Sequence, residues 1–192
     1  MIRLSCFVCA LVLGAVAAAG PWTSSAHGQL GVKIFRNSYI EFEIPDAWDC
    51  QREESVFICQ ESGRRTVGMI AILTGKYIDL ERDNIAVYGS ELAKRREWKS
   101  TNGKLVISSD IRSGTRCYAG KQWQWAHHYQ SELENYLTEY FARIEGDIAG
   151  LITVAFHRSV EAEGSAMAAT IARRLRMTAN PSAPDSKSGV EC

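Results

Sequence analysis

The chain has 192 residues, a length typical of one globular domain. Hydrophobic residues make up 46% and charged residues 23%, which is ordinary for a soluble globular protein. Lys+Arg and Asp+Glu are equal at 22 each, so the basic excess that favours nucleic acid or an anionic membrane is missing. We therefore expect no nucleic-acid partner.

Residues 1–26 have the order of features of a secretory signal peptide. Arg3 supplies a short positive start, and an apolar stretch follows from about Leu4 to Ala19. That stretch is shorter than the roughly 20 residues that a membrane-spanning helix needs. Small residues then offer two cleavage points, after Ala19 or after Ala26. We predict a secreted or periplasmic protein without a transmembrane segment after leader removal; an uncleaved N-terminal anchor is the alternative.

Alternating apolar and polar residues predict strands in the first part of the mature chain. In SYIEFEI, from Ser38 to Ile44, the apolar side chains share one face, and Pro45 ends the pattern. Ser55 to Gln60 and Val67 to Leu73 predict two further strands, separated by the turn-forming QESG.

A first long helix is predicted from Arg82 to Trp98, with Asp83 as its N-cap, because apolar side chains recur at helical spacing. A second helix is predicted from Glu161 to Leu175. Four strand segments lie between the helices, at Leu105 to Ile111, Lys121 to Ser131, Tyr136 to Glu145 and Ile148 to His157. We expect a single α+β domain at 34–177 and a disordered C-terminal tail at 178–192, whose composition is polar.

The cysteines indicate a disulfide. Cys6 and Cys9 belong to the leader, and four cysteines remain in a compartment that permits disulfides. Cys50 and Cys59 flank the polar QREES, a plausible turn, and their spacing is wrong for a zinc knuckle. We predict a disulfide between them. Cys192 has three options, namely a bond to Cys117, a bond between chains, or a free thiol.

The segment KQWQWAHHYQS holds the most conspicuous side chains. Adjacent residues of a strand point to opposite faces, so His127 and His128 are not expected to share a metal ion. If residues 132–135 form the loop to the next strand, His127 faces Tyr140. His157 is then displaced from His127 by about four residues along the sheet, which is about 14 Å at about 3.4 Å per residue. We expect neither a metal site nor a cofactor.

The same register predicts which side chains share a face. Trp123, Trp125, His127, Tyr129 and Tyr140 fall together and are our candidate ligand-binding residues, either filling the core or lining an aromatic pocket. The predicted second face places His128 opposite Glu139, an ion pair that would form below about pH 6.5.

Catalytic motifs are absent from the sequence, which has no Gly-x-Ser-x-Gly, Ser-x-x-Lys or His-Glu-x-x-His pattern. A basic cluster lies at the C-terminal end of the predicted first helix, where the helix dipole favours cations. Its alternative role is a surface for an anionic partner. The candidate partner-surface residues are Lys94, Arg95, Arg96 and Trp98.

The order of elements predicts an antiparallel sheet with two main helices packed on it. The opening YIEFEIPDAW, from Tyr39 to Trp48, resembles the "strand, Pro, Trp" start of the PsbP/Mog1-like fold, and the resemblance covers most of residues 35–176. Members of that family have varied roles, often in binding or assembly support. The resemblance therefore implies a non-enzymatic domain that binds a protein or small ligand, including an envelope or assembly accessory factor. The alternatives are a hydrolase-like enzyme using His127 or His128 as base, and a structural factor without a small ligand.

Overall fold

The computed structural model describes residues 31–53, 56–62, 68–79, 82–178 and 192. The predicted signal peptide and residues 179–191 of the predicted tail lie outside these residues. Among the described residues, neither helix has the length and apolar character required to cross a membrane.

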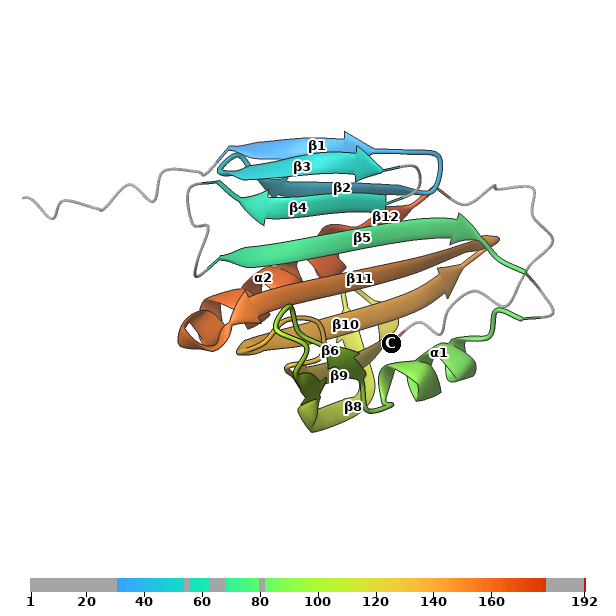
Figure 1. Cartoon of the computed structure of the whole chain (residues 1–192). Helices are drawn as coiled ribbons and strands as arrows, with labels where there is room; N and C mark the ends of the chain where they lie inside the picture. The colour runs from blue at the N-terminus through green and yellow to red at the C-terminus, as the bar shows by residue number, and fades with distance from the viewer. Residues whose placement is uncertain (1–30, 54–55, 63–67, 80–81, 179–191) are drawn as a thin grey trace, which may run out of the picture.

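A seven-stranded antiparallel sheet forms the body of the molecule (Figure 1). Its strand order is β3-β4-β5-β11-β10-β9-β8, so the central strand β11 and its neighbour β5 come from distant parts of the chain. The bounds are β3 Trp48–Glu53, β4 Val56–Glu61, β5 Met69–Tyr77, β8 Ser109–Tyr118, β9 Lys121–Tyr129, β10 Tyr136–Glu145 and β11 Ile148–His157.

Two smaller sheets complete the β structure. One has the order β1-β2-β12, with β1 Val32–Arg36, β2 Ile40–Pro45 and β12 Arg176–Met177. The other is a hairpin of β6 Glu97–Lys99 and β7 Leu105–Ile107.

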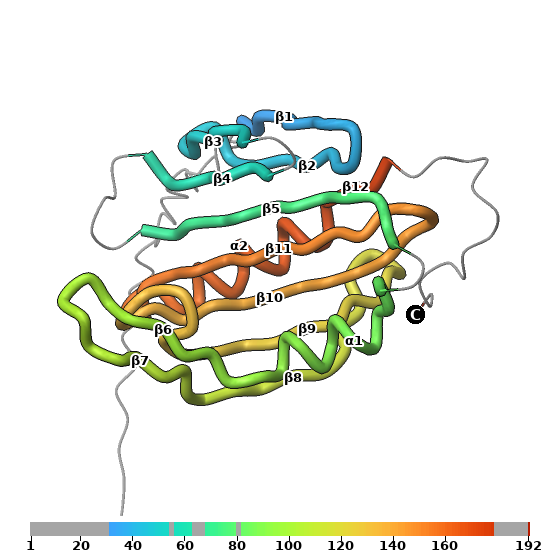
Figure 2. Tube along the Cα trace, turned by 45° about the vertical axis from the view of Figure 1, so that its right-hand side comes forward, coloured from blue at the N-terminus to red at the C-terminus, as the bar shows by residue number. Residues whose placement is uncertain are grey.

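The helices α1 (Ile85–Leu92) and α2 (Glu161–Arg174) lie on opposite sides of the large sheet, as Figures 1 and 2 show from two directions. A 3-10 turn, η1 (Arg158–Val160), leads from β11 into α2. We call the side of the sheet toward α1 the α1 face and the side toward α2 the α2 face. This arrangement confirms the α+β class and the two helices packed on an antiparallel sheet.

The α2 face holds the main hydrophobic core. Helix α2 approaches β11 so closely that a Cβ atom at Gly164 would lie 2.1 Å from the Phe156 ring, which explains the glycine there. The fully buried side chains of this core include Ile40, Phe42, Ile44, Leu73, Trp123, Phe141, Ile152, Val154, Phe156 and Ile171.

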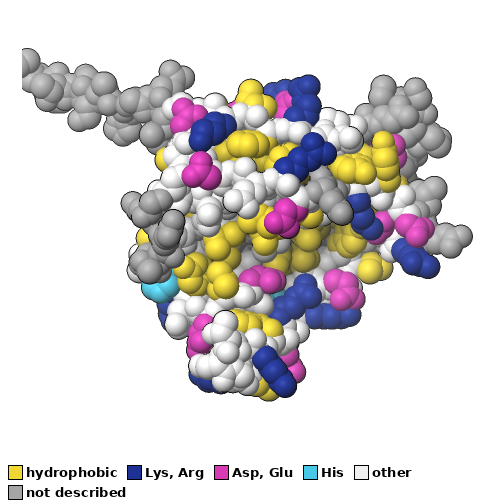
Figure 3. All heavy atoms as spheres, turned by 45° about the horizontal axis from the view of Figure 1, so that its top comes forward, with side chains coloured by type: hydrophobic (Ala, Val, Ile, Leu, Met, Phe, Trp, Pro, Cys, Tyr) yellow, Lys and Arg dark blue, Asp and Glu magenta, His cyan; other side chains and the backbone are white. Residues whose placement is uncertain are grey.

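The α1 face is only partly covered. Helix α1 packs over β9 and β10, where it buries Leu92 against Ala126, Tyr140 and Ala142. Farther across the sheet, on β4, β5 and β11, apolar side chains remain half-buried. They are Val56, Ile58, Ile70, Ile72 and Leu151. Apolar side chains gather in a band across the molecule in the view of Figure 3, with charged side chains beside it.

The first helix is shorter than predicted and is capped differently. Asn84, not Asp83, is the N-cap, because its side chain accepts a hydrogen bond from the Ala86 amide. The helix ends at Leu92 rather than Trp98. Trp98 instead belongs to β6, and its indole N–H donates to the Gln130 carbonyl at 3.0 Å. The basic cluster therefore follows the helix instead of forming its last turn, although Arg96 Nη2 still lies 3.5 Å from the Glu91 carbonyl of that turn.

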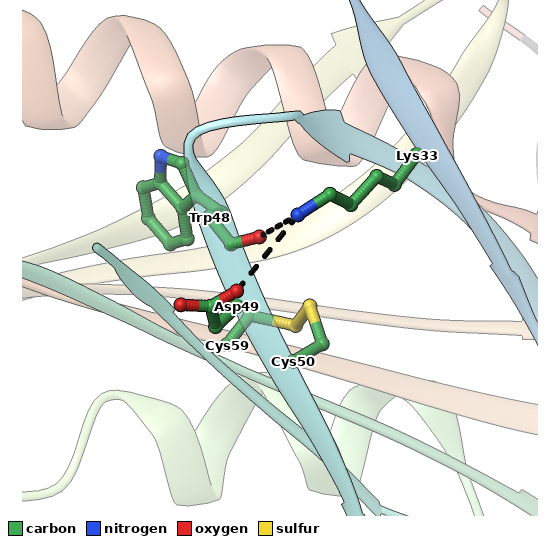
Figure 4. The surroundings of a disulfide bond; sticks show 5 residues. All are labelled: Lys33, Trp48, Asp49, Cys50 and Cys59. Carbon is green, nitrogen blue, oxygen red and sulfur yellow. Dashed lines mark hydrogen bonds and ion pairs between the residues drawn. A yellow bond between two sulfur atoms is a disulfide. The ribbon is translucent and has the colours of Figure 1, made fainter.

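Two disulfides are formed. Cys50 and Cys59 lie directly opposite each other in the β3–β4 hairpin and are bonded, which confirms the predicted pair (Figure 4). Lys33 of β1 donates to the Trp48 carbonyl at 3.0 Å and lies 3.8 Å from the Asp49 carboxylate, so β1 is attached beside this hairpin. The second disulfide joins Cys117 to Cys192, one of the three options open for Cys192.

Candidate functional site

The aromatic residues of β9 do not form one pocket with Tyr140. The structure pairs Tyr129 with Leu137 and His127 with Glu139, one residue away from the predicted register. Tyr140 therefore lies on the α1 face, opposite to Trp123, Trp125, His127 and Tyr129, and the predicted shared face is wrong. The register of β10 with β11 is as predicted, with Tyr140 opposite Thr153.

The two tryptophans of β9 contribute to the α2 core. Trp123 is 1% exposed and meets Phe141 edge to face, with 6.4 Å between ring centroids. Trp125 is half-buried, and the Arg116 guanidinium lies 3.7 Å from its ring centroid. The first is enclosed by protein, and the second is covered by a cation of the neighbouring edge strand β8.

His127 is buried, as predicted for a core histidine, but it also lines a pocket of about 370 Å³. Its Nδ1 lies 3.6 Å from the Glu139 carboxylate, while Nε2 has no hydrogen-bond partner among the described residues. Ser165 of α2 donates to Glu139 at 2.8 Å. The pocket, which we call the His127 pocket, is lined by Asp110, Ile111, Arg112, His127, Leu137, Arg158 and Glu161.

This constellation is not arranged for nucleophilic catalysis. A serine is activated when a histidine lies between its hydroxyl and the carboxylate. Here the Glu139 carboxylate lies between Ser165 and His127, so the histidine does not contact the hydroxyl. The geometry gives no support to the hydrolase alternative at His127.

His128 is fully buried beneath α1, so the predicted pairing with Glu139 on a second face is wrong. Its Nε2 lies 2.7 Å from the Leu92 carbonyl at the end of α1, and its ring meets Tyr140 edge to face. Burial lowers the pKa of His128 below 6.5, opposed by the hydrogen bond to Leu92 and assisted by the charge of Arg96. The imidazole is therefore neutral at pH 7, and Nε2 donates to the carbonyl.

A second hollow lies between α1 and the uncovered part of the sheet. This α1 cleft has a volume of about 320 Å³. The small residues Ala142 and Ala149 leave its space open, because larger side chains at these two positions would fill it. Its lining residues are Thr74, Lys76, Tyr88, Glu91, Leu92, Arg96, Ala142, Ala149, Gly150 and Leu151.

One end of the α1 cleft is fixed by a hydrogen-bonded network. Lys76 of β5 donates to both oxygens of Asp83 at 2.8 Å, and the Tyr88 hydroxyl donates to the same carboxylate. Burial alone would raise the pKa of Asp83, but these bonds and one from the Asp79 amide lower it to about 2. The carboxylate therefore stays charged and ties the start of α1 to the sheet.

The predicted partner-surface residues do not all point outward. Lys94 and Arg95 are exposed, and Lys94 pairs with Glu91. Trp98 is half-buried, and its indole N–H donates to the Gln130 carbonyl. The side chain of Arg96 lines the α1 cleft. A role for this surface in partner binding stays a prediction.

Within the described residues, the structure brings together no group of three or more His, Cys, Asp or Glu side chains able to hold a metal ion. This statement covers His127, His128 and His157. His157 lies at the end of β11, where it contacts the Tyr136 ring and Ser159.

The fold is that of PsbP-like proteins. The structure matches the solution structure of cyanobacterial PsbP (CyanoP) from Synechocystis sp. PCC 6803 with a TM-score of 0.54 and 10% identity, covering 82% of this chain and 99% of that one. LpqN of Mycobacterium tuberculosis, described as involved in cell envelope biogenesis, matches with a TM-score of 0.43 and 12% identity, over 72% of this chain and 83% of that one. No family model and no curated protein matches the chain. The match to CyanoP confirms the predicted PsbP/Mog1-like fold.

Proposed function

We propose that this chain is a secreted or periplasmic, non-enzymatic binding domain that holds an apolar ligand in the α1 cleft. The observation that carries the proposal is the cleft itself, an apolar hollow built over small side chains and bordered by a few charged ones. Sites for small molecules commonly combine an apolar lining with a small number of placed polar groups, in volumes of about 300 to 1,000 Å³. The α1 cleft has this composition at the lower end of that range.

The two disulfides and the leader-like N-terminal sequence support the location. Disulfides form and persist in secreted and periplasmic compartments and are rare in reducing ones. The order of a positive residue, an apolar stretch and small residues adds an independent reason to place the protein there.

Binding of the neutral apolar fluorophore N-phenyl-1-naphthylamine to the mature chain tests the proposal. We expect saturable fluorescence enhancement by the wild type. Ala149→Leu should weaken binding at least about tenfold, because the added side chain occupies the floor of the cleft. Ala86→Leu is the matched control, since Ala86 is exposed on α1 and does not line the cleft.

Circular dichroism and thermal unfolding are the controls that check whether both variants are folded. Two results contradict the proposal. One is the absence of saturable binding to the wild type, and the other is equal binding by a folded Ala149→Leu variant.

A further inference from the structure

Arg96 enters the α1 cleft from the turn that follows α1. Its backbone amide lies outside the helix and donates a hydrogen bond to the Ser108 hydroxyl at 2.8 Å. This bond fixes the backbone at Arg96 beside β7. Its guanidinium carbon lies 5.9 Å from the centroid of the Tyr140 ring. Tyr140 of β10 therefore contacts the side chain of Arg96, and the residue after β7 fixes its backbone.

The guanidinium of Arg96 is incompletely satisfied. Its Nε is buried and has no hydrogen-bond partner among the described residues. Its Nη2 reaches the Glu91 carbonyl only at 3.5 Å. Buried polar groups are normally hydrogen-bonded, so an unpaired guanidinium N–H beside a hollow indicates an acceptor that the protein chain itself does not supply.

The other charged groups at the cleft already have partners. Lys76 is engaged by both oxygens of Asp83, and the Glu91 carboxylate is paired with Lys94. The nearby Glu132 carboxylate accepts a hydrogen bond from the Tyr140 hydroxyl. Arg96 is therefore the one cation lining the cleft that has no ion pair within the described part of the chain.

We infer that the ligand of the α1 cleft has an apolar body and a single carboxylate, and that Arg96 binds this carboxylate. The inference rests on the proposed function. An arginine presents its donors in a planar fork that matches a carboxylate, and such charge-assisted bonds are among the stronger ones. The apolar walls take up the hydrocarbon part, and the volume of about 320 Å³ restricts it to a small body.

Displacement of N-phenyl-1-naphthylamine by three ten-carbon compounds tests the inference at pH 7.5. The compounds are decanoate, decan-1-ol and decyltrimethylammonium, each below its aggregation concentration. For the wild type, we expect decanoate to displace the fluorophore at a concentration at least about tenfold lower than decan-1-ol, with the ammonium compound weakest.

Arg96→Met should remove this preference, so that decanoate and decan-1-ol become equal, while the neutral fluorophore still binds. Arg95→Met is the matched control, because Arg95 is the adjacent exposed cation and does not line the cleft. It should keep the decanoate preference.

The outcomes separate this inference from the proposed function. Fluorophore binding without a preference for decanoate overturns the inference and leaves the apolar cleft standing. A preference for decanoate that persists in Arg96→Met also overturns it. Failure of the fluorophore to bind the wild type rejects the proposed function, and the inference with it.

Discussion

The two faces of the large sheet are used differently. On the α2 face, a helix of 14 residues and a second sheet cover the strands, and side chains such as Ile152 and Phe156 are fully buried. On the α1 face, a helix of eight residues covers only part of the same strands and leaves a hollow beside β5 and β11. The contrast indicates that packing on one face stabilises the domain, while the other face has room for a ligand.

Two adjacent residues of β11 test this contrast most strongly. Ile152 is buried on the α2 face, and Leu151 lines the α1 cleft. Ile152→Ala should lower the free energy of unfolding by about 2 to 5 kcal/mol, because it removes buried methyl groups and leaves a cavity. Leu151→Ala should lower it by well under half as much. Urea denaturation measures both.

The same pair should separate in ligand binding. Leu151→Ala should weaken the binding of N-phenyl-1-naphthylamine, whereas Ile152→Ala should leave it near the wild-type value in the folded protein. Equal losses of stability in the two variants would mean that the faces are not distinct.

The Cys50–Cys59 disulfide gives the next largest effect. Replacing both cysteines by serine should lower the free energy of unfolding by about 2.5 to 3 kcal/mol in the chain-entropy model for a loop of this length. Cys59 belongs to the α2 core, so the substitution should leave ligand binding in the α1 cleft unchanged. Thermal unfolding of the double variant, compared with the fluorophore titration, checks both statements. An unchanged unfolding midpoint would mean that the disulfide does not stabilise the fold.

The pH dependence caused by His128, which is buried beneath α1, is the smallest of the three expected effects on stability. Because burial lowers its pKa below 6.5 in the folded chain, the unfolded chain binds the proton more readily. The free energy of unfolding should therefore fall as the pH drops through about 6.5 toward the folded pKa, with no loss above that range.

The change is measured by urea denaturation at pH 7.5 and pH 5. His128→Gln keeps a donor for the Leu92 carbonyl and has no titrating ring, so its stability should change less between these two pH values. If the variant and the wild type change equally, His128 does not contribute to the pH dependence.

Much of the fold follows from local patterns in the sequence. The bounds of β10 and β11 were predicted to the residue, because both strands are long and apolar and the turn at Gly146 is short. Helix α2 was predicted to within one residue, at Arg174 instead of Leu175. By contrast, β1 and β3 were not predicted, because β3 is mostly polar and exposed, and β1 has no fully buried side chain and exposes the apolar Val32 and Ile34.

The register between β9 and β10 was not predictable in the same way. The chain between their paired residues Tyr129 and Leu137 includes Gln130 and Asn135, both with positive φ. Residues other than glycine rarely adopt this conformation, and nothing in the local sequence signals it at Gln130. A slip of one residue then exchanges the faces of every side chain in the strand.

The α1 cleft was missed for a different reason. Its floor consists of small residues on β10 and β11, and small side chains give a weak hydrophobic pattern. The predicted pairing of β10 with β11 was correct, so Ala142 and Ala149 could have been assigned to one face from the sequence. Their significance depends on α1 ending at Leu92, whereas the helix predicted from the sequence extends to Trp98.

The strand order of the large sheet has a consequence for how the chain reaches its native state. Strands β3 to β5 and strands β8 to β11 each pair with their neighbours in sequence, so each group forms through short-range contacts. Among the described strands, the β5–β11 ladder alone joins the two groups, and residues 78–147 lie between its nearest partners, Tyr77 and Ile148. Closing such a long segment requires more chain entropy than closing a hairpin. We therefore expect the junction of β5 with β11 to form after the hairpins and to set the rate of folding.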